Sequence, residues 1–271
     1  MNSPRHSLPI VDAESHNTPL PFHSSSSLST PRMTATHIVQ REVGSSIVIF
    51  DICAVILWLF CLAHYKQKRP LYFCFIGFII YYLVDGVIWM SLMHVRVISS
   101  PYNPYLVQVW LQLGPGIIHP SFVCLMLEGT FGPNCKEINR WFWIVLFIIV
   151  QFTPAILQKA YKGSSVIAVS RTMDSQRWLF VVIACLGYAY LIYKRVSWQN
   201  LGKIFLICTG VETGFEFSLF LSGIRKASLK TILIDCVLEF NVGAGLVVAL
   251  WRAMFSPIEK SEIDAVLSQK L

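Results

Sequence analysis

Six acidic residues lie well inside long apolar segments of this 271-residue sequence: Asp51, Asp85, Glu212, Glu216, Asp235 and Glu239. A carboxylate near the middle of a membrane helix costs roughly 2.5–3.5 kcal/mol even on a lenient insertion scale. These segments contain no Lys or Arg, so no acid has a cation on its own segment. Without a cation, burial favours the neutral, proton-carrying form of a carboxylic acid. The acids are therefore candidate proton donors.

The spacing of the polar residues indicates that they gather on common helix faces. Three pairs stand four residues apart, so each pair shares a face of its helix: Gln108/Gln112, Glu212/Glu216 and Asp235/Glu239. Two of the polar residues also have simpler interpretations. Asp51 could serve only as a hydrogen-bonding link between helices, and His119 could be a packing histidine.

Asp85 has aromatic neighbours in the stretch "YYLVDGVIWM". Tyr81, Tyr82 and Trp89 fall on its face of a helix by the same spacing. A protonated carboxylic acid can open an epoxide or protonate an alkene as a general acid. Trp and Tyr rings stabilise cations over their faces, so this face carries both parts of an acid-started carbocation reaction.

The elements that must position these residues are membrane helices. The sequence is 55% hydrophobic and only 14% charged, against about 25% charged in a typical soluble domain. Seven apolar segments are near the length that a helix needs to cross a bilayer, and the third is expected to be kinked or broken at Gly114–Pro115. The segments are 46–64, 71–93, 104–127, 141–158, 178–193, 204–223 and 231–251. The sequence thus predicts an all-α integral membrane protein with a seven-transmembrane-helix bundle.

The ends of the chain are polar and are predicted to lie outside this bundle. Residues 1–45 are rich in Ser, Pro and His, which predicts a disordered N-terminal arm. Residues 46–255 form the transmembrane domain, and residues 256–271 form a C-terminal tail. The basic loops favour a cytoplasmic C-terminus, which places most of the acids in the lumenal half of the bilayer. We expect a multi-pass protein of the endoplasmic reticulum or another endomembrane.

Several classes of protein are disfavoured by what the sequence lacks. The seventh segment has no Lys for a retinal Schiff base, and the seven histidines are dispersed rather than grouped as metal ligands. The eight cysteines show no C-x-x-C spacing, and the basic residues form no run of five. No D-D-x-x-D motif of soluble terpene synthases is present. We expect no metal and no nucleic-acid partner, and no obligate protein partner is evident.

Two stretches carry a resemblance to a known family. The stretch "KRPLYFCFIGFIIYYLVDGVIW" (68–89) resembles the second helix of the fungal integral-membrane terpene cyclases of the paxilline and pyripyropene type, with Arg69 and Asp85 at the family's spacing and Asp in place of its usual Glu. The stretch "LEFNVGAGLVVALW" (238–251) is similar to the family's last helix, and Glu239 is the best match to its second catalytic acid.

The resemblance implies a terpene cyclase that needs no cofactor. It would cyclise an epoxidised farnesyl or longer prenyl chain on a meroterpenoid-type substrate of secondary metabolism, taken from the surrounding lipid. Asp85 would start the reaction and Glu239 would be its partner or the final base. The candidate substrate-binding residues are Tyr81, Tyr82, Trp89, Gln112, Glu216 and Asp235. The alternative from the same buried acids is a proton-coupled small-molecule transporter or a receptor.

Overall fold

The computed structural model describes residues 38–133, 135–161, 163, 166–172, 176–226 and 228–269, and most of them are helical. Six helices are long and apolar enough to cross a membrane, which marks the chain as a membrane protein. They are Ile47–His64, Lys68–Leu92, Pro104–Phe131, Arg140–Ala160, Trp198–Leu221 and Leu229–Ala253. A shorter apolar helix covers Trp178–Tyr193.

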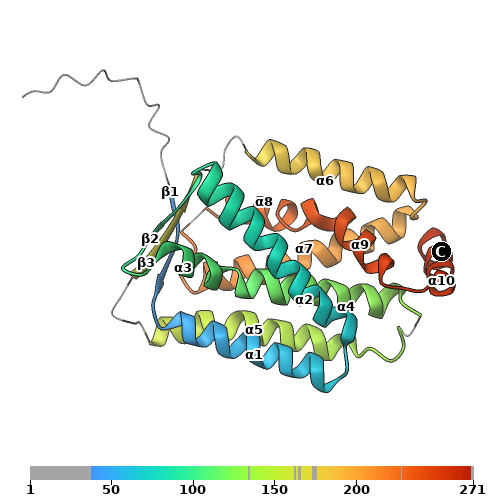
Figure 1. Ribbon diagram of the computed structural model, residues 1–271, viewed down its shortest axis with the longest axis horizontal. Helices are drawn as coiled ribbons and strands as arrows, with labels where there is room; N and C mark the ends of the chain where they lie inside the picture. Colours follow the sequence, from blue (N-terminus) through green and yellow to red (C-terminus); the bar gives the residue numbers. More distant parts are fainter. Residues whose placement is uncertain are drawn as a thin grey trace, which may run out of the picture. The chain divides into compact units, whose positions relative to one another are not determined.

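The helices pack side by side between a small sheet and the C-terminal helix (Figure 1). Contacts between α1 and α5, α2 and α4, α6 and α9, and α7 and α8 hold them together. In chain order the helical elements are α1 (Ile47–His64), α2 (Lys68–Tyr81), the π-helix η1 (Tyr82–Leu92), α3 (Pro104–Leu111), η2 (Gly114–Ile118), α4 (His119–Phe131), α5 (Arg140–Ala160), α6 (Gln176–Tyr193), α7 (Trp198–Leu221), α8 (Leu229–Leu238), η3 (Asn241–Gly243), α9 (Ala244–Ala253) and α10 (Pro257–Ser268).

Two of the long apolar segments are interrupted. The third is divided into α3, η2 and α4, as the Gly114–Pro115 sequence predicts, because Pro removes a backbone donor and clashes with the preceding turn. The last is divided at η3, which was not predicted. There Asn241 replaces lost backbone bonds: its Nδ2 donates to the carbonyl of Val237 at 2.7 Å, and its Oδ1 accepts from the Tyr188 hydroxyl at 2.6 Å.

A three-stranded antiparallel sheet closes one end of the helices, and it was not expected from the sequence. It consists of β1 (Ile38–Gly44), β2 (Arg96–Ser99) and β3 (Val166–Arg171) in the order β1-β3-β2. Side chains alternate between the faces of a strand. In β3 this alternation buries Ile167, Val169 and Arg171 together. The sheet therefore turns a basic residue inward, toward the helices.

The prediction for the N-terminal arm needs correction, and the C-terminal tail contains a helix. The N-terminal arm was predicted to be disordered through residue 45, but residues 38–44 form β1, because their backbone pairs with β3. The rest of that arm, residues 1–37, lies outside the described residues. Residues 257–268 of the predicted tail form α10, which begins with a capping box between Ser256 and Glu259 and buries Ile263 and Leu267.

The contact between α6 and α9 depends on two glycines. A Cβ atom added to Gly245 would lie 2.7 Å from the Cα of Gly187 and 2.8 Å from its carbonyl oxygen. A real Cβ cannot approach backbone atoms so closely, so the two helices would have to separate. This close approach brings α6 against the segment that carries Glu239.

We predict that Gly245→Ala lowers the free energy of unfolding by about 1–3 kcal/mol through overpacking. The matched control is Gly210→Ala in α7, where an added Cβ meets nothing within 4 Å. That variant is expected to raise stability by about 0.5–1 kcal/mol, because Gly is a poor helix former. Thermal unfolding in detergent measures both variants, and equal effects would show that the α6–α9 contact can yield without cost.

Candidate functional site

A cavity of about 210 Å³ lies between the inner face of the sheet and helices α2, η1, α7 and α9. Its two ends differ in chemistry. One end carries six arginine, aspartate and glutamate side chains: Arg41, Asp85, Arg96, Arg171, Glu212 and Glu239. The other is aliphatic and is formed by residues of α2 and α9, including Ile76, Gly77, Ile80, Val247 and Leu250. The cavity thus suits a molecule with a long apolar part and a reacting end near the charged groups.

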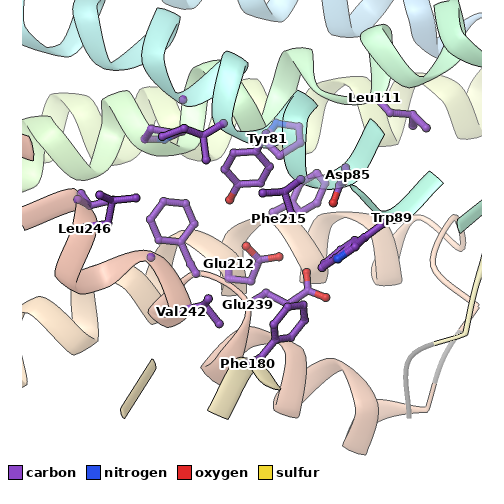
Figure 2. A pocket seen from close by; sticks show the side chains of 18 of the residues that line it. Tyr81, Asp85, Trp89, Leu111, Phe180, Glu212, Phe215, Glu239, Val242 and Leu246 are labelled. Carbon is purple, nitrogen blue, oxygen red and sulfur yellow. The ribbon is translucent and has the colours of Figure 1, made fainter. Parts of the chain in front are cut away.

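The aromatic residues of the cavity stand beside its acids. Figure 2 shows the carboxyl groups of Asp85, Glu212 and Glu239 directed into one space, with the Trp89 indole between Asp85 and Glu239. The Tyr81 hydroxyl points toward Glu212. The rings of Trp89 and Phe180 lie 5.4 Å apart and join η1 to α6 at this end of the cavity.

Each strand of the sheet supplies one arginine to the charged end. Arg41 comes from β1, Arg96 from β2 and Arg171 from β3, and Arg96 stands directly opposite Arg171 in the strand register. Burial lowers the pKa of the Arg96 guanidinium, against the opposite effect of Asp85. Burial also acts to lower the pKa of Arg171, but Glu239 and Asp85 outweigh it and raise that pKa. The sheet therefore presents fixed positive charges to the acids of the helices.

Asp85 and Glu239 are both ion-paired to these arginines. Arg96 contacts Asp85, whose Oδ2 also accepts a hydrogen bond from Gln112 Nε2 at 3.1 Å. Arg171 Nη2 lies 2.5 Å from Glu239 Oε1. The sequence analysis predicted a neutral Asp85 without a cation. No cation lies on its own helix, as expected, but Arg96 reaches it from strand β2, which the sequence analysis did not foresee.

Glu216 and Asp235 lie outside the cavity lining, where Arg225 and Arg41 form ion pairs with them. Arg225 forms an ion pair with Glu216, with its Nε 2.9 Å from Oε2, and its Nη2 donates to Asp235 Oδ2 at 2.7 Å; its side chain is only 1% exposed. Arg41 holds the other oxygen of Glu216 at 3.1 Å. Neither Glu216 nor Asp235 lines the cavity. Their contribution is to fix α7, α8 and the sheet relative to one another.

Glu212 differs from the other acids of the site. It is 3% exposed and lines the cavity, and no arginine or lysine of the described residues forms an ion pair with it. The basic side chain in contact with Glu212 is His119, whose Nδ1 lies 4.0 Å from Glu212 Oε2. Glu212 was recognised from the sequence as one of six buried acids, but not as a site residue.

Three carboxylates meet at this point, and we considered whether they could hold a metal ion. One oxygen each from Glu212, Glu216 and Glu239 lies within 4.8 Å of the others. However, Glu216 is already bound by two guanidinium groups and Glu239 by a third. Positive charge at the cluster is thus supplied by arginines, and the donor set does not suit a divalent cation.

Some of the remaining predicted residues line the cavity and others lie outside it. Tyr81 and Trp89 line the cavity, and the guanidinium of Arg171 lies 5.0 Å from the centre of the Trp89 ring. Tyr82 does not line it and stacks on Phe78. Gln112 acts through Asp85. Asp51 lies in a separate, smaller cavity and accepts a hydrogen bond from Trp110, which fits a structural role.

The arginines are the site residues that the sequence analysis missed. One signal for them was present, because "VIAVSR" places Arg171 in period-two alternation with Ile167 and Val169. The chain matches no family model, no curated protein and no solved structure.

Proposed function

We propose that this protein is a membrane-bound terpene cyclase that starts ring closure by proton transfer to a prenyl chain. One observation carries the proposal: a single cavity joins an aliphatic arm to an end where three carboxyl groups face aromatic rings. The resemblance of residues 68–89 and 238–251 to fungal integral-membrane terpene cyclases supports it. The substrate class is an epoxidised farnesyl or longer prenyl chain on an aromatic or polyketide head group.

The chemistry requires only groups of this chain. A carboxyl group gives its proton to the epoxide oxygen or to an alkene carbon, and the C–O bond or the π bond breaks to leave a carbocation. Neighbouring alkenes attack in turn and form the rings, while Trp89 and Phe180 stabilise the positive charge through their π faces. The last cation loses a proton to a carboxylate. The product is an isomer of the substrate, so no cofactor is consumed.

We further propose that α6 is a seventh crossing segment, with the sheet on the lumenal side. Basic residues outside the ion-paired site gather at the opposite end, as the positive-inside rule expects of a cytoplasmic face: Lys66, Lys68, Arg140, Lys194 and Arg195. Glycosylation acceptors fused to both ends of the chain test this topology. Only the N-terminal acceptor should be modified. Modification of both acceptors would require an even number of crossings and would contradict the proposed seven.

The function is tested by incubating the purified protein with prenylated aromatic compounds that do or do not carry a terminal epoxide. The expected result is a cyclised product of unchanged mass, formed without added metal or cofactor. In D₂O, protonation of an alkene leaves one deuterium on carbon, whereas protonation of an epoxide leaves it on an exchangeable hydroxyl. No cyclised isomer from either compound would overturn the proposal.

One observation favours a second candidate, a proton-coupled transporter. Both the third and the last long segments are interrupted, at η2 and η3, and transporters often build substrate sites from such broken helices. The same compounds separate the two functions. A transporter reconstituted in vesicles would accumulate them unchanged in response to a pH gradient, and a cyclase would convert them.

A further inference from the structure

The cavity contains three acids, and their surroundings assign them different roles. Asp85 contacts Arg96, and Glu239 contacts Arg171. A guanidinium in direct contact stabilises the carboxylate form of an acid. Both residues are therefore suited to act as negative charges or as proton acceptors, and poorly suited to hold a proton at rest.

Glu212 has the surroundings of a proton donor. It lies within 4.8 Å of Glu216 and Glu239, and both of those neighbours have arginine partners. A third negative charge at this point would be repelled by two others and would have no cation of its own. Burial of an unpaired charge adds a further cost, which a carboxyl group avoids by remaining neutral.

The side of Glu212 that faces away from the cavity supports the same assignment. His119 is fully buried there, and neither ring nitrogen makes a hydrogen bond in the described part of the chain. Its ring is enclosed by aromatic neighbours, with Phe215 at 4.9 Å, Phe147 at 6.0 Å and Phe240 at 6.1 Å between ring centres. Such surroundings disfavour an imidazolium, so His119 provides a neutral polar contact rather than a charge to stabilise ionised Glu212.

We propose that Glu212 carries the transferable proton of this site and that Glu239 receives the proton released at the end of ring closure. This inference rests on the proposed cyclase function. Glu212 transfers its proton to the substrate and becomes a carboxylate as the carbocation forms. After ring closure a C–H bond of the last cation breaks, its electron pair forms an alkene, and Glu239 takes the proton.

The geometry also allows the proton to return from Glu239 to Glu212 through one bridging water molecule. Oxygens of Glu239 and Glu212 lie within 4.8 Å of one another. Protonated Glu239 no longer compensates the charge of Arg171, whereas ionised Glu212 stands beside charged Glu216. Transfer of the proton from Glu239 to Glu212 restores the charge pairing of Glu239 with Arg171 and removes the repulsion between Glu212 and Glu216. The site then returns to its resting state. The complete cycle then neither consumes nor releases a proton, as an isomerisation requires.

Infrared spectroscopy of the resting, full-length protein tests the assignment independently of activity. A protonated carboxylic acid gives a C=O stretching band that a carboxylate lacks. We expect Glu212→Gln to remove part of this band and the matched variants Asp85→Asn and Glu239→Gln to retain it. If Glu212→Gln fails to fold, ¹³C-carboxyl labelling of the glutamates in the wild-type protein should shift the band, and labelling of the aspartates should leave this component in place.

Product formation completes the test. Glu212→Gln should lower the rate of cyclisation about 10²–10⁴-fold, the range for loss of a general acid. If Glu212→Gln leaves the band unchanged, or cyclises at close to the wild-type rate, the assignment is overturned while the cyclase function stands. If the band belongs to Glu212 but the wild-type protein forms no cyclised product, the proposed function is overturned. The assignment of the proton to Glu212 then still stands.

Discussion

Replacement of Arg225 by Met is expected to lower the free energy of unfolding by about 3–5 kcal/mol, the cost of breaking a buried ion pair from one side. Its guanidinium forms ion pairs with both Glu216 and Asp235, at 2.9 and 2.7 Å, and all three side chains are at most 4% exposed. The substitution would leave carboxylates in the protein interior with reduced compensation. It would also release the link between α8 and the end of α7.

The matched control is the next residue along the chain. Lys226 pairs with Glu42, but these side chains are 53% and 40% exposed. Water screens such a pair, so Lys226→Met should cost only about 0–1 kcal/mol. Thermal unfolding in detergent compares the two variants. The triple variant Arg225→Met/Glu216→Gln/Asp235→Asn should recover part of the loss, and similar stabilities for Arg225→Met and Lys226→Met would contradict the buried network.

Asp85→Asn is expected to reduce kcat/KM for cyclisation by about 10²–10³-fold, the range for loss of one preorganised electrostatic contact. Its carboxylate stands beside Trp89, where the proposed ring closure would develop positive charge. The substitution would also leave Arg96, with a side chain 5% exposed, uncompensated at the cavity. That cation would repel the carbocation that the site must stabilise.

A double variant separates this role from that of a proton donor. If Asp85 acts as the charge partner of Arg96, Asp85→Asn/Arg96→Gln should regain part of the lost activity, because the uncompensated cation is gone. If Asp85 is the acid that starts the reaction, the double variant should stay as inactive as Asp85→Asn alone. Tyr82→Phe is the control, since Tyr82 lies outside the cavity lining and should leave the rate unchanged.

The sequence was sufficient to predict a membrane protein of long apolar helices, of which six in the described residues are long enough to cross a bilayer. Long apolar runs must be helical in a bilayer, because every backbone group has to find a partner within the segment. The spacing of Asp235 and Glu239 predicts a shared helix face, yet of these two only Glu239 lines the cavity, together with Asp85. The interruption at Gly114–Pro115 follows from backbone chemistry alone.

The charge partners could not be predicted in the same way, because they depend on tertiary structure. Arg41 lies 175 residues from Glu216, in the short stretch IVQREVG that precedes the first apolar segment. Pairing with β3, rather than a strong local preference, makes that stretch a strand. Glu212 and Glu216 share a helix face, yet only Glu212 lines the cavity. The difference arises because Arg41 and Arg225 occupy the space around Glu216.

The strand order β1-β3-β2 has a consequence for biosynthesis. The central strand is the last of the three to leave the ribosome, so the sheet cannot close until residue 171 has been synthesised. Glu212, Glu216, Asp235 and Glu239 all follow that point in the chain. The arginines of the sheet are therefore already gathered at one membrane face when the acidic helices are inserted. The nascent chain thus makes Arg41 and Arg171 before Glu216 and Glu239, the acids that they neutralise.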